Sequence, residues 1–446
     1  MRTTRTYTIQ PAQQSSLKSN ILDYCARFEY SAYYDSNNFQ YGVGYREKYA
    51  EFELLAAANT SLILTNTKTI LNDVDRFMAT TPDWLFGYLS YDLKNSFHST
   101  ESNNTNQFNY KNYSFFRPET VFTLKGNVLS IHSFLDSQTV DNITKELLSK
   151  KPKEEKTKRD AIHLKSTLSK EEYIERVNGL KQHIQIGDIY EVNLCQEFSA
   201  TAIELDPKQL YSQLKATSPT PFSAWFRETN QYLLCASPER YIKKKGSLLF
   251  SQPIKGTGPR SNDEAEDKQN LKNLLQSEKE ISENVMIVDL VRNDLSRLAT
   301  KGSVTVEECC EPYGFPHVYQ LISTVCCQLR STLQFSDIIK ATFPMGSMTG
   351  APKLRAMQLA ETAETFQRGI YSGAVGYITP NGDFDFNVVI RSFVYNEANG
   401  YLSYSVGGAI TMLSEAEAEY NECLVKAQAM NKTLETLNGT DFEENH

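Results

Sequence analysis

The feature that most constrains the fold is a β-rich segment interrupted by two Asn-Gly pairs. Between Tyr371 and Val406 the chain is rich in Val, Tyr and Phe, and Asn381-Gly382 and Asn399-Gly400 interrupt it. An Asn-Gly pair between β-rich segments is a strong signal for a tight hairpin, because both residues tolerate positive φ angles. The spacing predicts an antiparallel meander of three strands, with Arg391 in the middle strand.

Helical patterns occur on both sides of this predicted sheet. Ser169 begins a capping box, and Tyr173, Val177 and Leu180 follow at helical spacing. Another helix is expected to end near Leu434. Hydrophobic residues make up 40% of the chain, which is enough for a large core. Antiparallel strands with interspersed helices indicate an α+β fold rather than a doubly wound parallel sheet.

One charged segment divides the chain. Residues 149–165 begin with SKKPKEEKTKRD, which contains no apolar residue other than one proline and cannot bury surface. We expect this segment to be a linker or a long exposed loop. It would separate an N-terminal subdomain, residues 1–148, with a structural or regulatory role, from a second domain, residues 166–440, that carries the candidate chemical groups.

The composition excludes several classes of function. The 46 Lys and Arg residues against 54 Asp and Glu give a net charge of −8, which argues against nucleic-acid binding. No apolar run approaches the roughly 20 residues of a membrane span, and the sequence begins without the apolar segment of a signal peptide. The eight cysteines contain no CxxC, so free thiols in the cytoplasm are a better interpretation than zinc.

Paired carboxylates form the first candidate site. Glu280 and Glu283 are three residues apart in a predicted helix, and Glu419 and Glu422 repeat the spacing in the last helix. Four carboxylates from two helices could hold Mg²⁺, which prefers oxygen ligands. The alternative is two solvated helix faces, with Lys426 in a simple i,i+4 ion pair with Glu422.

Glycine-rich turns form the second candidate site. Residues 343–353 read FPMGSMTGAPK before an expected helix, and Gly407-Gly408-Ala409 follows the predicted meander. Amides at a helix start can hold a carboxylate, and glycine lets a ligand approach the backbone. The alternative for each cluster is a tight turn, and neither matches a phosphate-binding GxxxxGK[ST] loop.

Lys255 lies between a β-like run and a Gly-rich turn. Burial would lower the pKa of its amine and make it a nucleophile, although a solvated lysine is the simpler interpretation. Glu239 could act as a general acid, and Arg391 could bind a carboxylate through a bidentate contact. Ordinary ion pairs are the alternative for both residues.

Taken together, these segments resemble the chorismate-utilising enzyme family, which includes anthranilate synthase component I. They occur in the family's order across most of residues 166–430. The resemblance implies antiparallel sheets that form a β-sandwich-like core flanked by helices. The matching segments are SPER (237–240), PIKGT (253–257), SENVMIVDLVRNDL (282–295), GSMTGAPK (346–353), YSGAVGY (371–377), Ile390-Arg391, VGGAI (406–410) and ExxExxxK (419–426).

Within the family, PIKGT resembles the aminodeoxychorismate synthases, because anthranilate synthases typically carry PIAGT. This implies that Lys255 attacks chorismate covalently, with Glu239 as the acid for the departing hydroxyl. Ammonia would then give 4-amino-4-deoxychorismate, a precursor of 4-aminobenzoate and folate. A separate glutamine amidotransferase subunit would supply the ammonia, since no cysteine elbow of that type occurs here.

The resemblance also implies the remaining roles. Mg²⁺ would be bound by Glu283 and Glu422, with Glu280 and Glu419 acting directly or through water. The implied substrate-binding residues are Thr257, Thr349, Tyr371, Arg391, Gly407, Gly408, Ala409 and Lys426.

Two positions depart from the family pattern. Gln320 stands where a histidine is common, and a glutamine cannot shuttle a proton. Glu191 stands where water-adding relatives carry a lysine and amine-adding relatives carry a glutamine, so an isochorismate or salicylate synthase is disfavoured. The open alternatives are anthranilate synthase component I and a homologue that binds chorismate without turnover.

Overall fold

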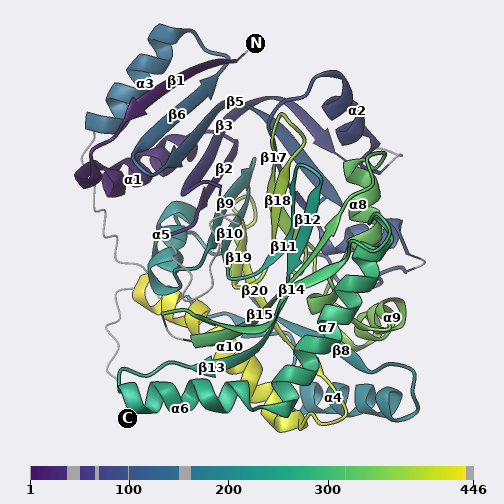
Figure 1. The fold of residues 1–446 in the computed structure, drawn as a ribbon. Coiled ribbons are helices and arrows are strands. Elements are labelled where there is room, and N and C mark those ends of the chain that lie inside the picture. The colour runs from purple at the N-terminus through teal and green to yellow at the C-terminus, as the bar shows by residue number, and fades with distance from the viewer. Residues whose placement is uncertain are drawn as a thin grey trace.

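The computed structural model describes residues 2–37, 51–65, 70–98, 100–149, 162–316 and 318–437. Its strands pair only in the antiparallel sense and form two sheets that share one long strand (Figure 1). Helices cover the outer faces of both sheets. The expected α+β fold is confirmed.

In the described part of the chain, the first sheet contains a run of ten paired strands and two short additional ones. Paired neighbours along it are β8 (Glu191–Ala200), β20 (Tyr401–Ile410), β19 (Ser392–Asn396), β10 (Gln231–Ser237), β9 (Phe222–Glu228), β2 (Tyr30–Asp35), β3 (Leu54–Thr65), β5 (Tyr113–Lys125), β6 (Val128–Ser133) and β1 (Thr3–Thr8). The short strands β7 (Lys165–Ser166) and β16 (Gly350–Ala351) also pair with β8.

The second sheet starts from the same β5. It continues through β4 (Leu85–Leu89), β17 (Ala374–Ile378), β18 (Phe384–Val388), β11 (Arg240–Lys245), β12 (Leu248–Gln252) and β15 (Val318–Gln328), which pairs with β13 (Ile254–Pro259) and β14 (Thr305–Gly314).

The predicted three-stranded meander is wrong in its connectivity. Both Asn-Gly turns form hairpins, but these are two separate hairpins, β17–β18 and β19–β20. Each lies in a different sheet, because β18 pairs with β11 and β19 pairs with β10. Arg391 lies between β18 and β19 with φ of +51°, where the chain leaves one sheet and enters the other.

Three apolar clusters define the layers. One lies between the sheets and includes Phe86, Phe116, Phe226 and Tyr377. This inter-sheet cluster is the sandwich-like core that the family resemblance implied. The other two clusters fill the space between each sheet and its helices.

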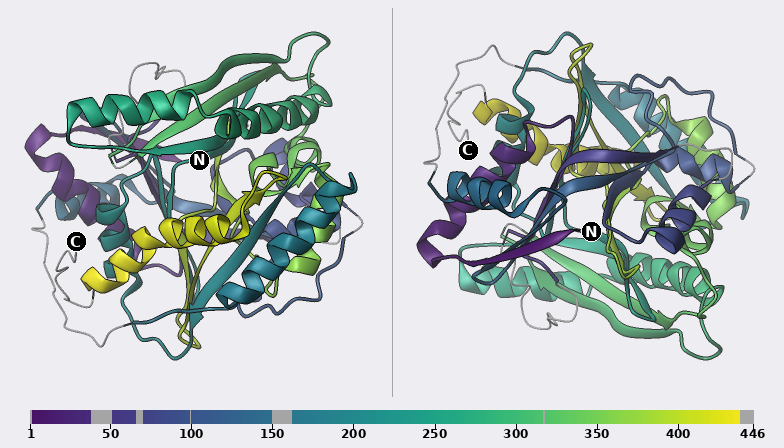
Figure 2. Two further views of the ribbon diagram at one scale, coloured as in Figure 1. Left: turned by 90° about the horizontal axis from the view of Figure 1, so that it is seen from below. Right: turned by 90° about the horizontal axis from the view of Figure 1, so that it is seen from above.

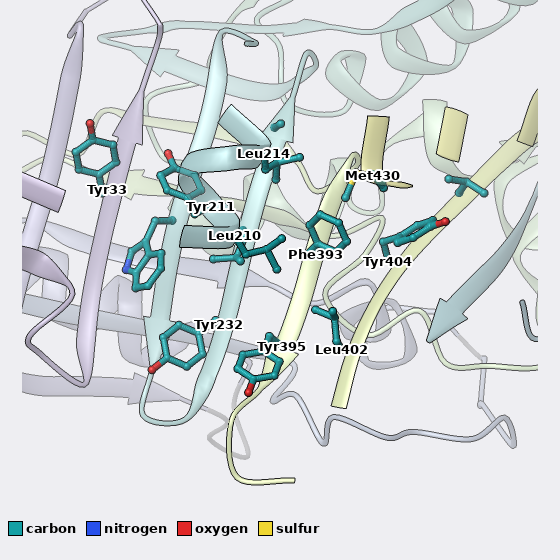
Figure 3. Packing of buried hydrophobic residues seen from close by; sticks show 14 of the residues in the cluster. Tyr33, Leu210, Tyr211, Leu214, Tyr232, Phe393, Tyr395, Leu402, Tyr404 and Met430 are labelled. Atoms are coloured by element: carbon teal, nitrogen blue, oxygen red, sulfur yellow. The ribbon is translucent and has the colours of Figure 1, made fainter. Parts of the chain in front are cut away.

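The helices on the first sheet include α4 (Lys170–Gln185), α5 (Pro207–Thr217), α9 (Lys353–Ala363) and α10 (Ala416–Leu437). Figure 3 shows how aromatic rings beneath them pack, among them Tyr211 from α5, Tyr232 from β10 and Phe393 from β19. Such rings bury a large apolar area, which holds α10 and α5 against the strands.

The second sheet is covered by α6 (Glu264–Leu275) and α7 (Glu278–Ser296), with α2 (Asn72–Thr80) and α8 (Phe335–Thr342) nearby. Seen from below, α10 crosses the molecule between α4 and the α6–α7 pair (Figure 2). Two more helices, α1 (Gln14–Cys25) and α3 (Ser137–Ser149), pack near the N-terminal strands. The 3-10 segments are η1 (Pro11–Gln13), η3 (Tyr91–Ser96) and η4 (Gly346–Met348).

Residues 1–148, the expected N-terminal subdomain, contribute strands to both sheets. β2 pairs with β9, and β4 pairs with β17. Most of the expected linker, residues 150–161, lies outside the described residues. Among the described helices, none is long and apolar enough to cross a membrane.

Candidate active site

The candidate site lies where the chain crosses between the two sheets. Glu239 stands between β10 and β11, and Arg391 stands between β18 and β19. The two crossings are hydrogen-bonded neighbours, because Val388 N–H donates to the Glu239 carbonyl and Ala236 N–H donates to the Arg391 carbonyl, both at 3.0 Å. Polar side chains can collect here because neither crossing has the regular alternation of a strand.

Lys255 on β13 is paired with Glu191 on β8. The lysine Nζ donates to Glu191 Oε1 at 2.9 Å, and the side chains are 11% and 1% exposed. Burial alone would lower the pKa of Lys255, but Glu191, Glu283 and Glu239 raise it above its ordinary value. The expectation of a lowered pKa is therefore wrong for the ligand-free protein, in which Lys255 is an ammonium ion.

Glu239 is the second buried carboxyl near Lys255. Its Oε1 accepts a hydrogen bond from Ser347 Oγ at 2.5 Å. Burial raises the pKa of Glu239 to about 7, against the opposing influence of Ser347 and Lys255. A carboxyl with this pKa is partly protonated at neutral pH, as a general acid must be. We refer to Lys255, Glu191 and Glu239 as the strand cluster.

Arg391 is a cation without a counter-ion in the described part of the chain. No hydrogen bond or ion pair of its side chain with another described residue occurs, and burial lowers its pKa. Its positive φ is rare for a residue with a side chain and occurs where surrounding structure imposes it. A half-buried guanidinium with no partner among the described residues favours an anionic ligand, such as a carboxylate, that would pair with it.

The four predicted metal-binding glutamates lie on α7 and α10. Lys279 links the two helices, with its Nζ 3.3 Å from Glu419 Oε1 and 4.0 Å from Glu283 Oε1. Burial raises the pKa of Glu283 to about 7 and also raises that of Glu280. Burial opposes ionisation of Glu422 as well, but Lys426 lowers its pKa overall. We refer to the four glutamates and Lys279 as the helix cluster.

The donor set of the helix cluster suits Mg²⁺. All four side chains offer carboxylate oxygens, and Glu283 Oε1 is buried without a hydrogen-bond partner among the described residues. The Lys279 ammonium lies between two of the carboxylates, so the cluster already attracts a cation. In the described ranges, no three His, Cys, Asp or Glu side chains gather closely enough to hold a metal without rearrangement.

The glycine segment of β20 pairs with β8 and approaches the helix cluster. Gly407, Gly408 and Ala409 lie opposite Cys195, Leu194 and Asn193 of β8. A Cβ on Gly407 would lie 2.6 Å from Cys195 Sγ and 2.7 Å from the Leu194 carbonyl, so packing of the strand requires this glycine. A Cβ on Gly408 would lie 3.2 Å from Glu419 Oε2.

Lys426 completes this contact. Its Nζ donates to the Gly407 carbonyl at 2.9 Å and lies 2.7 Å from Glu422 Oε1. The i,i+4 ion pair, which was the alternative interpretation of Lys426, is therefore present. The bond to Gly407 also ties α10 to β20, so the lysine is more than a solvated helix residue.

The other predicted substrate-binding residues lie at different depths. Thr349 is buried, and its Oγ1 donates to the Met345 and Gly346 carbonyls, both at 3.2 Å. Tyr371 is buried, and burial raises the pKa of its hydroxyl. Thr257 lies opposite Gln320 on β15 and its side chain is exposed.

Sequence reasoning missed four residues that organise the site. Ser347 holds Glu239, and Lys279 bridges the helix cluster. Asn284 Nδ2 donates to the Lys255 carbonyl at 2.9 Å and to the Leu321 carbonyl at 3.0 Å. Arg368 is buried and donates to the Met348 and Asn193 carbonyls, both at 2.8 Å. Ser347 and Asn284 lie inside the quoted family segments, and Lys279 and Arg368 each lie three residues before one, so proximity to those segments was the available signal.

Both departures from the family pattern are buried in the site. Glu191 Oε2 and Gln320 Oε1 have no hydrogen-bond partner among the described residues. His317, the histidine three residues before Gln320, lies outside the described residues. These two buried oxygens lie on the two strands beside Lys255. A polar ligand bound there would supply the hydrogen bonds that they lack.

Comparison with known proteins now defines the class. The family model described as "chorismate binding enzyme" matches residues 29–432. The chain therefore belongs to the chorismate binding enzymes, as the sequence resemblance indicated.

Relatives carry more specific names. The chain is 42% identical over 270 residues to "Probable aminodeoxychorismate synthase, chloroplastic" of Oryza sativa subsp. japonica, covering 60% of this chain and 30% of that protein. It is 40% identical over 270 residues to "Aminodeoxychorismate synthase component 1" of Escherichia coli, covering 60% and 59%. The chain therefore spans less than a third of the Oryza sativa protein and about three fifths of the Escherichia coli protein.

Solved structures agree with the fold. Anthranilate synthase component I from Streptococcus pneumoniae superposes with a TM-score of 0.75 at 25% identity, covering 88% of this chain and 95% of that one. MenF, the menaquinone-specific isochorismate synthase from Escherichia coli, gives 0.76 at 15% identity, covering 97% and 94%. At that identity the second likeness shows the fold alone.

Proposed function

We propose that this chain catalyses the amination of chorismate to 4-amino-4-deoxychorismate, as component I of an aminodeoxychorismate synthase. The observation that carries the proposal is the buried Lys255–Glu191 pair, with Glu239 close by. In this proposal Lys255 is the nucleophile, Glu191 the proton acceptor and Glu239 the proton donor. The relatives named aminodeoxychorismate synthase support the same reaction.

The first step removes a proton from Lys255. Glu191 is the acceptor, because its Oε1 already receives a hydrogen bond from the lysine Nζ at 2.9 Å. The freed amine attacks C2 of chorismate, the ring double bond shifts, and the bond from C4 to the hydroxyl breaks. Asn284 supports this geometry by holding the Lys255 carbonyl.

Glu239 supplies the proton for the leaving hydroxyl, which departs as water. Its pKa of about 7 makes a neutral carboxyl available at physiological pH. Ser347 fixes the orientation of the carboxyl. Arg391 binds a substrate carboxylate, which is the anionic partner its guanidinium lacks in the described structure.

When bound, Mg²⁺ would be held by Glu283 and Glu422, with Glu280 and Glu419 direct or through water, and would neutralise the substrate's ring carboxylate. Without a cation, the four glutamates would repel the anionic substrate, so its ring carboxylate needs this neutralisation in order to bind. Lys426 adds a cation at the edge of the cluster.

Ammonia completes the reaction by attacking C4. The bond between Lys255 and C2 breaks, the double bond returns, and the lysine recovers its proton from Glu191. The ammonium formed at C4 returns a proton to Glu239, which restores the acid. We propose that a separate glutamine amidotransferase subunit supplies the ammonia and that the reaction takes place in the cytoplasm. The relatives called "component 1" support a second component.

Anthranilate synthase component I is the second candidate, and the fold likeness to the Streptococcus pneumoniae enzyme favours it. That reaction loses pyruvate and needs no lysine nucleophile. A homologue that binds chorismate without turnover is disfavoured, because the strand cluster retains an amine and two carboxyls that could act as nucleophile, base and acid.

Product analysis tests the proposal. The purified chain is incubated with chorismate, Mg²⁺ and an ammonium salt at mildly alkaline pH, and products are separated by liquid chromatography and mass spectrometry. We expect a product that retains the enolpyruvyl group and has exchanged hydroxyl for amine. Anthranilate with free pyruvate would establish the second candidate, and unchanged chorismate would favour the non-catalytic homologue.

A further inference from the structure

The chain contains two pairs of adjacent cysteines, and only one of these pairs has its two sulfurs shown close together. Cys326 and Cys327 lie in β15, where successive side chains point to opposite faces, and they belong to different apolar clusters. Cys309 and Cys310 lie in β14 with their sulfurs 4.0 Å apart. Cys309 is exposed and Cys310 is half-buried.

A β-bulge brings the second pair of thiols together. The register between β14 and β15 shifts between Glu308 and Glu311, and Cys310 has φ of +55°. A regular strand would point these two side chains apart, whereas the bulge aims them to one side. A positive φ at cysteine is uncommon and persists only where the surroundings impose it.

The bulge is also joined to the candidate active site by three hydrogen bonds in series. Cys310 N–H donates to Ser323 Oγ at 2.9 Å, and Ser323 Oγ donates to Asn284 Oδ1 at 2.5 Å. Asn284 Nδ2 then donates to the Lys255 carbonyl at 2.9 Å. Ser323 and Asn284 are fully buried, so water does not compete for these bonds.

We propose that Cys309 and Cys310 form a reversible two-electron redox site that closes to an intramolecular disulfide and is linked to the Lys255 segment. The oxidant is a small disulfide such as oxidised glutathione. The exposed Cys309 thiolate attacks it, giving a mixed disulfide and one released thiol. The Cys310 thiolate then attacks the Cys309 sulfur, which closes the ring and releases the second thiol.

Two physical features make this site slow and reversible. Burial and the neighbouring Cys309 raise the pKa of Cys310 to about 11, so the closing step is slow at neutral pH. Adjacent Cα atoms are about 3.8 Å apart, below the usual disulfide range of about 4.4–6.8 Å. A disulfide closed under that constraint is readily reduced, which suits regulation rather than stabilisation.

The chemistry is tested without any enzymatic turnover. Reduced protein is incubated with oxidised glutathione, alkylated, and analysed by intact-mass and peptide-mass spectrometry. We expect the loss of two hydrogens, mapped to Cys309 and Cys310, while Cys326 and Cys327 stay reduced as the internal control. Cys310→Ser should stop at the mixed disulfide on Cys309. A stable mixed disulfide on the unsubstituted protein, or dimers joined through Cys309, would overturn the proposal.

The link to Lys255 is tested by hydrogen–deuterium exchange. Oxidation should raise exchange at least about twofold in the peptide that carries Lys255, because the bond chain holding that backbone is disturbed. Ser323→Ala should still form the disulfide but lose this response. Identical exchange in the oxidised and reduced proteins would disprove the link, whatever reaction the enzyme catalyses.

Discussion

The strand cluster and the helix cluster lie in one site, but they differ in how their charges are satisfied. In the strand cluster, Lys255 is held by Glu191 at 2.9 Å and Glu239 by Ser347 at 2.5 Å. In the helix cluster, Lys279 lies 3.3 Å from Glu419 and 4.0 Å from Glu283. The Lys279 side chain is 37% exposed, against 11% for Lys255.

We infer from this difference that the strand cluster carries out the chemical step and that the helix cluster binds the metal ion. Short, buried contacts fix proton donors and acceptors in advance, which is what bond-making and proton transfer require. The longer contacts of the Lys279 ammonium with Glu283 and Glu419 leave room for a metal ion and for an anionic substrate. Substitutions in the strand cluster should therefore change the rate of the chemical step, and those in the helix cluster should change metal affinity.

The largest effect is expected for Lys255→Ala. Without the amine no covalent adduct can form, so kcat for ammonia-dependent amination should fall at least about a thousandfold. Lys255→Arg is the matched control, because it keeps a positive charge beside Glu191 but offers no free amine. If either variant retained a near-normal rate, the nucleophile assignment would be lost.

The second-largest effect is expected for Glu239→Gln. Removing the general acid should slow adduct formation about a hundredfold or more. Because the pKa of Glu239 is about 7 and the protonated form is the active one, the rate should fall as pH rises through about 7. The substituted protein should not show this alkaline decline. Adduct formation is measured without ammonia, so that the titration of ammonium does not enter the profile.

Arg391→Ala should act on binding rather than on chemistry. Losing a charge-assisted contact to a carboxylate should raise KM for chorismate about 10- to 100-fold with a smaller change in kcat. Arg391→Lys keeps the charge but not the bidentate geometry and should recover only part of the loss. Steady-state kinetics separate the two parameters, and an unchanged KM in both variants would remove Arg391 from the substrate site.

The smallest effects should come from a pair of opposite substitutions in the helix cluster. Lys279→Met removes the competing cation, so half-saturation by Mg²⁺ should occur at a concentration about two- to fivefold lower. Glu283→Gln removes a ligand, so half-saturation should require more Mg²⁺. Isothermal calorimetry with Mg²⁺ measures both without turnover. Shifts in the same direction would contradict the distinction between the clusters.

Much of this organisation could be predicted from the sequence, since local signals coincide with the fold. The two Asn-Gly turns form hairpins where expected, and the ExxE spacing places each pair of glutamates on one helix. What failed was long-range pairing. The positive φ of Arg391 separates the hairpins into different sheets, and no residue nearby signals that β18 will pair with β11.

The charge state of Lys255 could not be predicted for the same reason. Its pKa depends on Glu191, 64 residues away in the sequence, and on Glu283 from a helix. Likewise, nothing in the order of residues indicates that Ser347 will orient Glu239. The residue types in the site were therefore predictable, but their partners were not.

The most direct test of the central claim is to look for the covalent adduct. The protein is mixed with chorismate and Mg²⁺ without ammonia, quenched, and analysed by intact-mass and peptide-mass spectrometry. We predict a mass increase equal to chorismate less water, located on Lys255 and lost when ammonia is added. Turnover to the aminated product without any adduct on Lys255 would contradict it.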